Sequence, residues 1–283
     1  QPDYGYALLV DSRTKDLTPM VKTASQVQKR TIHTLLDSSG GIDKPSQFVV
    51  TSTFEGVSAE MMRNTLASEN LDDLQKRYLN FYARYYPSVS LSSPMRVENK
   101  EALNQLVVTE FYTIPKLWTH NQEKARTESS YYAPDIDGLL LRPSQTLRDT
   151  PLALTHPYDL TQVTEIRLPS VWKVTEEDKE FSGPGFRLRH EVHVNDQQVI
   201  LRDHFSSVSD QLMPDQIAKH VETIEAAKAS LGFTIWQNDA VEEGGKTVDD
   251  GDASGVANAQ SIDSHTNWVA VTLSFLLVIT FWQ

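Results

Sequence analysis

The chain has 283 residues, a formal net charge of −12, 39% hydrophobic residues and 23% charged residues. This composition is ordinary for a globular protein with some unstructured length, and the negative charge argues against nucleic acid as a partner. The chain contains no cysteine, which excludes disulfides, thiolate metal sites and a cysteine nucleophile within it.

The first residues lack the basic region and the long apolar run of a signal peptide. A strand-like pattern starts at once, so we expect the chain to be a piece of a longer protein. Alternation of apolar and polar residues predicts strands in the first half of the chain. They are expected at residues 6–10, 17–21, 28–36 and 47–54, with a hairpin at 97–114 that turns at 99–102.

Two helices are expected between these strands. Ser58 is the predicted N-cap of the first, which runs to Leu66, and Asn70 is the predicted N-cap of the second, which Pro87 stops. The second helix carries an aromatic stripe at helical spacing, formed by Tyr78, Phe81, Tyr82, Tyr85 and Tyr86. We interpret this stripe as the face that packs on a sheet, because aromatic side chains dominate core burial. The alternative is a platform for a ligand.

The following polar stretch, residues 120–130, is expected to be a loop or a short helical passage, and residues 139–141 are expected to be buried. The block from Leu160 to Phe205 then predicts three strands, at 163–168, 186–194 and 199–205. The second strand is entered through the turn 183–185, and Asn195-Asp196 forms the bend before the third. One apolar sheet face needs a covering layer, and we expect the aromatic helix and a helix from Pro214 to Leu231, ended by Gly232, to supply it.

The last part of the chain changes in character. Residues 237–266 contain seven acidic residues and one basic residue, a net charge of −6, which predicts a disordered linker. Trp268–Trp282 is uncharged, with tryptophan at both ends, and we interpret it as a membrane anchor that is short for a full span. The linker carries little positive charge, which places it outside the cytoplasm. The alternative is a last buried strand or helix.

No combination of side chains predicts a catalytic, cofactor or metal site. His190 and His193 are three apart in a strand and should point to opposite faces, unlike the paired histidines of a helical zinc motif. Asp203, His204 and Ser206 are too close along one strand to form a triad. The acidic run 176–178 is expected to be a solvated turn or helix start, and Gly183 and Gly185 lie between strands, not before a helix that could hold a phosphate.

Several stretches, in this order, resemble the C-terminal part of bacterial transglutaminase-like proteins, which carry a β-sandwich domain of unknown function around a papain-like core. The most family-like stretch is Val108–Trp118, centred on Glu110–Pro115. The others are Asp3–Leu8 with Thr18–Met20, Phe54–Gly56 with Ala59–Asn64, Tyr78–Pro87, His156–Tyr158, Ile166–Pro169 with Trp172, Phe186–Phe205 and Pro214–Gly232. The resemblance covers residues 1–236.

The resemblance and the patterns above together predict an α+β, mainly antiparallel, β-sandwich-like domain with packed helices and a C-terminal apolar segment. Residues 1–24 would be the tail end of the core, 25–236 the accessory domain, 237–266 the linker and 267–283 a truncated transmembrane segment. The cysteine, histidine and aspartate of such a core would lie before Gln1, so no catalytic residue is assigned to this chain.

The function implied is that of a non-catalytic accessory domain of a membrane-anchored envelope protein. The domain would support the core or bind a protein or peptide partner or substrate, and it would lie in the periplasm of a bacterium, anchored to the inner membrane. Two alternatives stay open. The chain is a fragment of an active cysteine peptidase or transamidase, or it is a stand-alone envelope binding module whose residues 1–24 pair with its own sheet.

Overall fold

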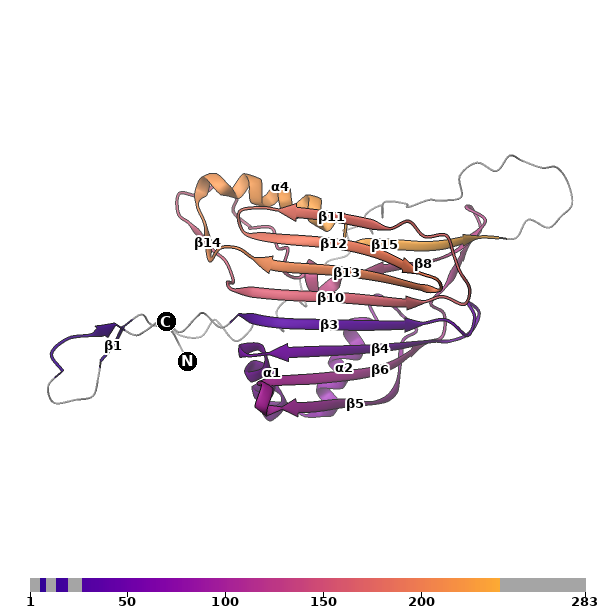
Figure 1. Ribbon diagram of the computed structural model, residues 1–283, viewed down its shortest axis with the longest axis horizontal. Coiled ribbons are helices and arrows are strands. Elements are labelled where there is room, and N and C mark those ends of the chain that lie inside the picture. Colours follow the sequence, from indigo (N-terminus) through magenta and orange to yellow (C-terminus); the bar gives the residue numbers. More distant parts are fainter. Residues whose placement is uncertain (1–5, 9–13, 20–26, 240–283) are drawn as a thin grey trace, which may run out of the picture.

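A computed structural model describes residues 6–8, 14–19 and 27–239 of the protein (Figure 1). The acidic linker was expected at 237–266, but Gln237 and Asn238 belong to the last strand, Gly232–Asn238. The rest of the expected linker from residue 240 onward and the apolar segment Trp268–Trp282 lie outside the described residues. The fold is α+β with mainly antiparallel strands, as the sequence predicts.

The organising element is an eight-stranded sheet with the strand order β11-β12-β13-β10-β3-β4-β6-β5. All neighbouring pairs are antiparallel except β10 and β3, which pair in parallel at the centre and join the two halves of the sheet. Its strands are β3 (Gln28–Asp37), β4 (Ser46–Glu55), β5 (Ser90–Lys100), β6 (Gln105–Ile114), β10 (Tyr158–Arg167), β11 (Glu177–Ser182), β12 (Phe186–Asn195) and β13 (Gln198–Ser207).

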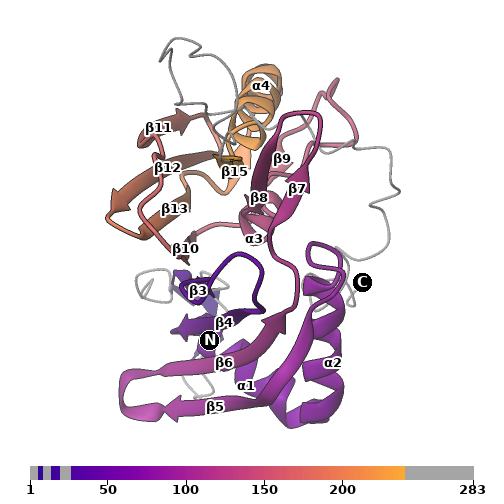
Figure 2. The ribbon, with the colours of Figure 1, turned by 90° about the vertical axis from the view of Figure 1, so that its right-hand side faces the viewer.

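A second layer covers one face of this sheet (Figure 2). Helices α1 (Val57–Ser68) and α2 (Leu71–Tyr82) lie over the half that contains β3 to β6. A three-stranded sheet in the order β15-β8-β7 and the helix α4 lie over the other half. The remaining elements of this layer are α3 (Pro134–Asp137), α4 (Ile217–Lys228), β7 (Thr119–Asn121), β8 (Arg126–Tyr132), β15 (Gly232–Asn238) and the short pair β9 (Leu152–Ala153) and β14 (Gln211–Leu212).

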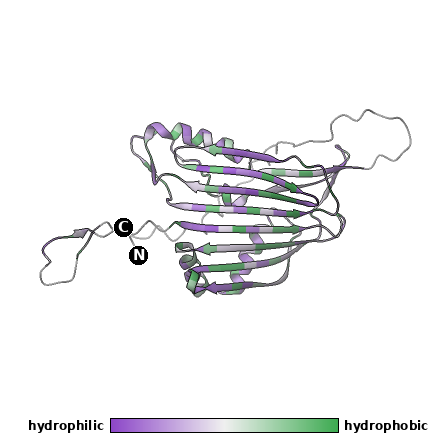
Figure 3. Ribbon diagram, in the orientation of Figure 1, coloured by the Kyte–Doolittle hydropathy of each residue, from purple (hydrophilic) through white to green (hydrophobic). Residues whose placement is uncertain are grey.

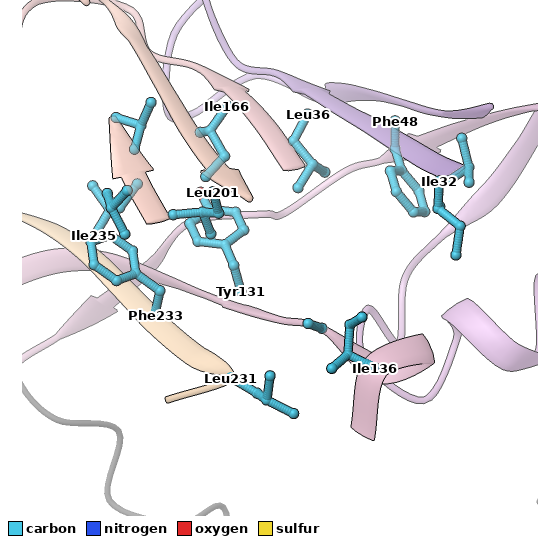
Figure 4. Close-up of a cluster of buried hydrophobic side chains, with 14 of the residues drawn as sticks. Ile32, Leu36, Phe48, Tyr131, Ile136, Ile166, Leu201, Leu231, Phe233 and Ile235 are labelled. Atoms are coloured by element: carbon cyan, nitrogen blue, oxygen red, sulfur yellow. The ribbon is translucent and has the colours of Figure 1, made fainter. Parts of the chain in front are cut away.

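The main hydrophobic core lies between the two layers (Figure 4). Ile32, Leu36 and Phe48 enter it from the first half of the large sheet, and Phe233 and Ile235 enter it from β15. Along β4, β6 and most of β12 and β13 the buried residues alternate with more exposed ones, because successive side chains of a strand point to opposite faces. Hydrophobic and hydrophilic positions are therefore interspersed along the strands (Figure 3), and no described element covers the outer face of the sheet.

The aromatic stripe of α2 packs on the sheet, as predicted. The rings of Tyr82 and Tyr86 lie 4.9 and 5.4 Å from the ring of Phe48 on β4, in edge-on geometry. The ring of Tyr82 also lies 5.4 Å from that of Tyr112 on β6. The stripe therefore covers the first half of the sheet, and the expectation that it would cover the strands around residue 190 is wrong.

The structure corrects two expectations about strands. The polar stretch at 120–130 is not a loop: it enters β7 and β8, because β8 finds a partner in β15, more than a hundred residues later in the chain. The acidic run at 176–178 leads into the edge strand β11, which pairs with β12. Charged residues are well placed on an edge strand, where they deter pairing with other chains.

The helix ends also differ in part from the expectation. The side chain of Asn70 caps α2 as predicted, with its Oδ1 accepting from the Asp72 amide at 2.9 Å. The N-cap of α1 is Gly56, at φ 58°, and Ser58 already lies inside the helix. The last helix ends at Lys228 instead of running to Leu231, and Gly232, its expected terminator, is the first residue of β15.

Two short strands near the N-terminus stand apart from this body. β1 (Tyr6–Ala7) and β2 (Thr18–Pro19) form a two-stranded antiparallel sheet of their own (Figure 1). Neither strand belongs to the eight-stranded sheet. Tyr6, Leu8 and Leu17 are exposed, with 59, 64 and 61% of their surface accessible.

Candidate functional site

The two histidines of β12 point to opposite faces of the sheet, as strand parity predicts. His190 is 2% exposed and faces the inner layer, whereas His193 is on the open face. The Asp203–His204 pair is divided in the same way, with Asp203 buried and His204 on the outer face. The structure therefore brings together neither the two histidines of a metal site nor the three residues of a triad along β13.

A different pair meets across the strands: His190 Nδ1 lies 2.8 Å from Asp203 Oδ1, because the two residues are directly paired between β12 and β13. Asp203 is 4% exposed, and burial raises the pKa of its carboxyl group, against the hydrogen bond and the charge of His190, which lower it. The other ring nitrogen of His190 has Glu177 Oε2 at 3.9 Å, and Glu177 forms an ion pair with Lys179.

This His–Asp pair has the geometry in which a carboxylate orients an imidazole. A catalytic role would also require a nucleophile or a substrate at the second ring nitrogen, and within the described residues that position faces a carboxylate. The neighbouring Gln162 on β10, paired with Asp203, is buried, and its Oε1 has no hydrogen-bond partner. We interpret His190, Asp203 and Gln162, which lie side by side on three neighbouring strands, as a buried polar network of the fold.

A second buried polar cluster lies between α2, α3 and the first half of the sheet. The hydroxyl of Tyr112 donates to Glu110 Oε2 at 2.5 Å, and Glu110 is 3% exposed. Arg30 Nη1 donates to Asp135 Oδ1 at 3.0 Å, and its Nη2 donates to the hydroxyl of Ser52 at 3.4 Å. Burial raises the pKa of Glu110 to about 7, although Tyr112 and Arg30 act to lower it.

A carboxyl group with a pKa near 7 in a protein interior is a signature of general acids and bases. Burial also raises the pKa of Tyr78 on α2 to about 12, so this tyrosine stays a neutral neighbour of Glu110. Glu110 is enclosed, however, and its bonded partner is a tyrosine of its own strand. In the sequence, the stretch Val108–Trp118 is distinguished only by its family likeness. The tertiary packing shows that Glu110 within it is buried.

The outer face of the sheet carries exposed ion pairs that cross the strands. Arg189 contacts both carboxylate oxygens of Asp178, at 3.0 and 2.9 Å. His204 Nε2 lies 3.0 Å from Asp159 Oδ2, and Arg167 bridges Asp37 and Glu165. Near the end of the same strands, His156 Nδ1 lies 2.8 Å from the hydroxyl of Ser207, which also accepts from the amide of Tyr158. Exposed pairs of this kind contribute little to stability.

A shallow recess lies beside the edge strand β15. It has a volume of about 10 Å³, room for about one water molecule, and is bordered by Lys173–Thr175 on one side and by Phe233–Trp236 on the other. Among residues 6–8, 14–19 and 27–239, no group of three or more histidine, aspartate or glutamate side chains is placed to hold a metal ion. None of the helices in these ranges is long and apolar enough to cross a membrane.

Comparisons with known proteins place the chain in no family. No protein-family model matches it, and neither the curated proteins nor the solved structures contain a significant match.

Proposed function

We propose that the protein is a non-catalytic accessory domain that is attached to a transglutaminase-like core and supports that core or presents a partner or substrate to it. The observation that carries this proposal is the β1–β2 hairpin, which stands apart from the eight-stranded sheet and exposes Tyr6, Leu8 and Leu17. In this proposal the β-sandwich-like body is residues 25–236, and the hairpin belongs to the surface of the core.

Two physical arguments support this assignment. An isolated two-stranded hairpin is marginally stable in water, so it needs another surface against which to pack. Three exposed apolar side chains close together indicate such a contact. A stand-alone binding module would instead pair these residues with its own sheet, yet in the described chain β1 and β2 pair with each other.

The core would supply the chemistry. Its cysteine, histidine and aspartate would be encoded before Gln1, and the present chain, which lacks cysteine, would contribute no catalytic group. The first test is therefore the sequence that precedes Gln1 in the gene. Absence of a cysteine, histidine and aspartate in that order would overturn the link to a transglutaminase-like core.

The second test concerns the hairpin. In the natural full-length protein, Leu8→Lys or Leu17→Lys should lower the thermal stability of the core, because each places a charge in the proposed contact. Leu147→Lys is the matched control, since Leu147 is a leucine on a loop with 96% exposure and should tolerate lysine. Equal effects of the hairpin variants and the control would contradict the proposal.

We further propose that Trp268–Trp282 anchors the protein in a bacterial inner membrane, with the globular domain in the periplasm. The support is the uncharged, tryptophan-flanked composition of this segment after an acidic stretch. Cell fractionation of the natural protein tests this proposal. Recovery in the soluble fraction without detergent, with the segment intact, would refute it.

A further inference from the structure

The outer edge of β15 carries backbone groups that no other strand among the described residues uses. β15 is an edge strand in the order β15-β8-β7. The amide of Ala133 donates to the carbonyl of Leu231, and the amide of Asp239 donates to the carbonyl of Ala125. Leu231 and Ala133, and likewise Asp239 and Ala125, are therefore hydrogen-bonded pairs of the antiparallel ladder, in which both residues direct their backbone groups toward the neighbouring strand.

The register between these two bonds is continuous, with Gly232 opposite Tyr132 and Asn238 opposite Arg126. Hydrogen-bonded pairs alternate with non-bonded pairs along an antiparallel ladder. Phe233 and Ile235 therefore direct their amides and carbonyls toward β8. Thr234 and Trp236 direct theirs away from β8, and no bond within residues 27–239 reaches them.

These outward groups line the recess described above. Its opposite wall, Lys173–Thr175, belongs to the connection between β10 and β11 and forms no backbone hydrogen bond with β15 or with another described segment. The wall is held at its two ends, by the buried Trp172 and by Glu176, whose side chain accepts from the amide of Val194 at 3.0 Å. A row of donors and acceptors thus faces a wall that hydrogen bonds do not hold in place, and an added strand would displace this wall because the recess itself has room for about one water molecule.

We propose that the edge of β15 is a peptide-binding site that takes an extended protein segment by β-strand addition. An open strand edge offers a ready template for such pairing, in which main-chain hydrogen bonds provide affinity and alternate side chains provide specificity. This inference goes beyond the proposed function and does not depend on it, since the edge belongs to the globular body.

The surroundings define the kind of segment that fits. Side chains on one face of the added strand would lie on the side of Phe233 and Ile235, which are buried in the core, and near Val174, which packs against that core. Side chains on the other face would lie beside Thr234 and the ring of Trp236, over which Arg126 stacks at 4.4 Å. The site therefore favours a segment that alternates apolar and polar residues.

Amide hydrogen exchange of the whole chain tests the edge directly. In the free protein, the amides of Thr234 and Trp236 should exchange much faster than those of Phe233 and Ile235. Adding a blocked hexapeptide of alternating threonine and valine should slow exchange at Thr234 and Trp236. The same peptide with all of its backbone amides N-methylated keeps its side chains but lacks donors, and it should leave exchange unchanged. Equal protection of all four amides without peptide, or equal effects of both peptides, would overturn the proposal.

A variant pair provides the second measurement. Thr234→Pro removes the outward amide without removing a donor to β8, and proline is tolerated where a strand edge faces solvent. It should weaken binding of the hexapeptide about tenfold or more. Thr234→Val changes the side chain, keeps the amide and should bind like the wild type. Wild-type affinity in a folded Thr234→Pro variant would refute the site, and the exchange measurement decides the question if that variant does not fold.

Discussion

Glu110 is a residue whose ionisation matters for this fold, because it is almost fully enclosed and accepts a hydrogen bond from Tyr112. Its pKa in the folded protein is about 7, compared with 4.5 for an unperturbed glutamate. Between these two values the folded state binds more protons than the unfolded state. The stability must therefore fall as the pH rises through this window and level off above pH 7.

We predict that the free energy of unfolding decreases by about 3 kcal/mol between pH 4.5 and pH 8 on account of this one group. Glu110→Gln keeps the shape and can still accept from Tyr112, so it should remove this contribution and be more stable than the wild type at pH 8. Denaturant unfolding of both proteins at several pH values measures the effect. An unchanged pH dependence in the variant would contradict the assignment.

The buried partner of His190 provides a second prediction. Asp203→Ala leaves a buried imidazole without its hydrogen-bonding carboxylate and should destabilise the protein by about 3 kcal/mol. Asp178→Ala removes an exposed aspartate that contacts Arg189 on the same sheet, and it should change the stability far less. Denaturant unfolding gives the free energy of unfolding of each variant. Equal losses in Asp203→Ala and Asp178→Ala would show that burial of the aspartate does not determine its contribution to stability.

Among the elements, the two helices of the first half differ in how they begin. Asn70 caps α2 with its side chain, whereas α1 starts at Gly56 without a side-chain cap. Asn70→Ala should therefore cost about 1 kcal/mol of stability. Ser58→Ala, at the position that the sequence suggests as a cap, should have no such cost, because alanine is favoured inside a helix. Thermal unfolding of the two variants compares them, and a larger loss for Ser58→Ala would contradict the structure.

The edges of the large sheet are protected in two different ways. β11 carries four charged residues among its six, Glu177, Asp178, Lys179 and Glu180, and β5 carries Pro94 and two register irregularities. Charge, proline and bulges each deter pairing with another chain. The open edge of β15 lacks these features, which distinguishes it as the place where strand addition is favoured.

For the whole molecule, the body should fold without the β1–β2 hairpin. None of the eight strands comes from residues before Gln28, and both layers of the core are built from residues 27–239. We predict that removing residues 1–26 leaves the free energy of unfolding of the body unchanged within about 1 kcal/mol, since no ladder of the eight-stranded sheet is lost. Denaturant unfolding measures this difference. A substantial loss would show that the hairpin packs on the body, against the proposed function.

Local patterns were sufficient for much of the fold. The alternation of side chains in β3, β4 and β12 predicted strands with two distinct faces, because the side-chain period of a strand is set by the backbone alone. The same parity separated His190 from His193. The aromatic spacing of α2 identified its packing face, because residues three and four apart share one side of a helix.

Pairing between distant segments could not be derived in this way. The sequence of β8 resembles a polar loop, and its strand structure depends on pairing with β15. The acidic start of β11 resembles a solvated turn, and its strand structure depends on pairing with β12. The His190–Asp203 contact depends on register: a bend at Asn195-Asp196 would set His190 opposite Leu201, whereas the observed pairing of Asn195 with Gln198 sets it opposite Asp203. Shifting a turn by one residue moves every partner by two.

The sequence thus established which side chains face inward, since that depends on local backbone geometry. Only the tertiary structure established which of them meet, which carboxyl groups are enclosed and which strand edge stays open. Those properties arise from contacts between segments, where a shift of a turn by one residue decides whether a histidine is paired with an aspartate or with a leucine.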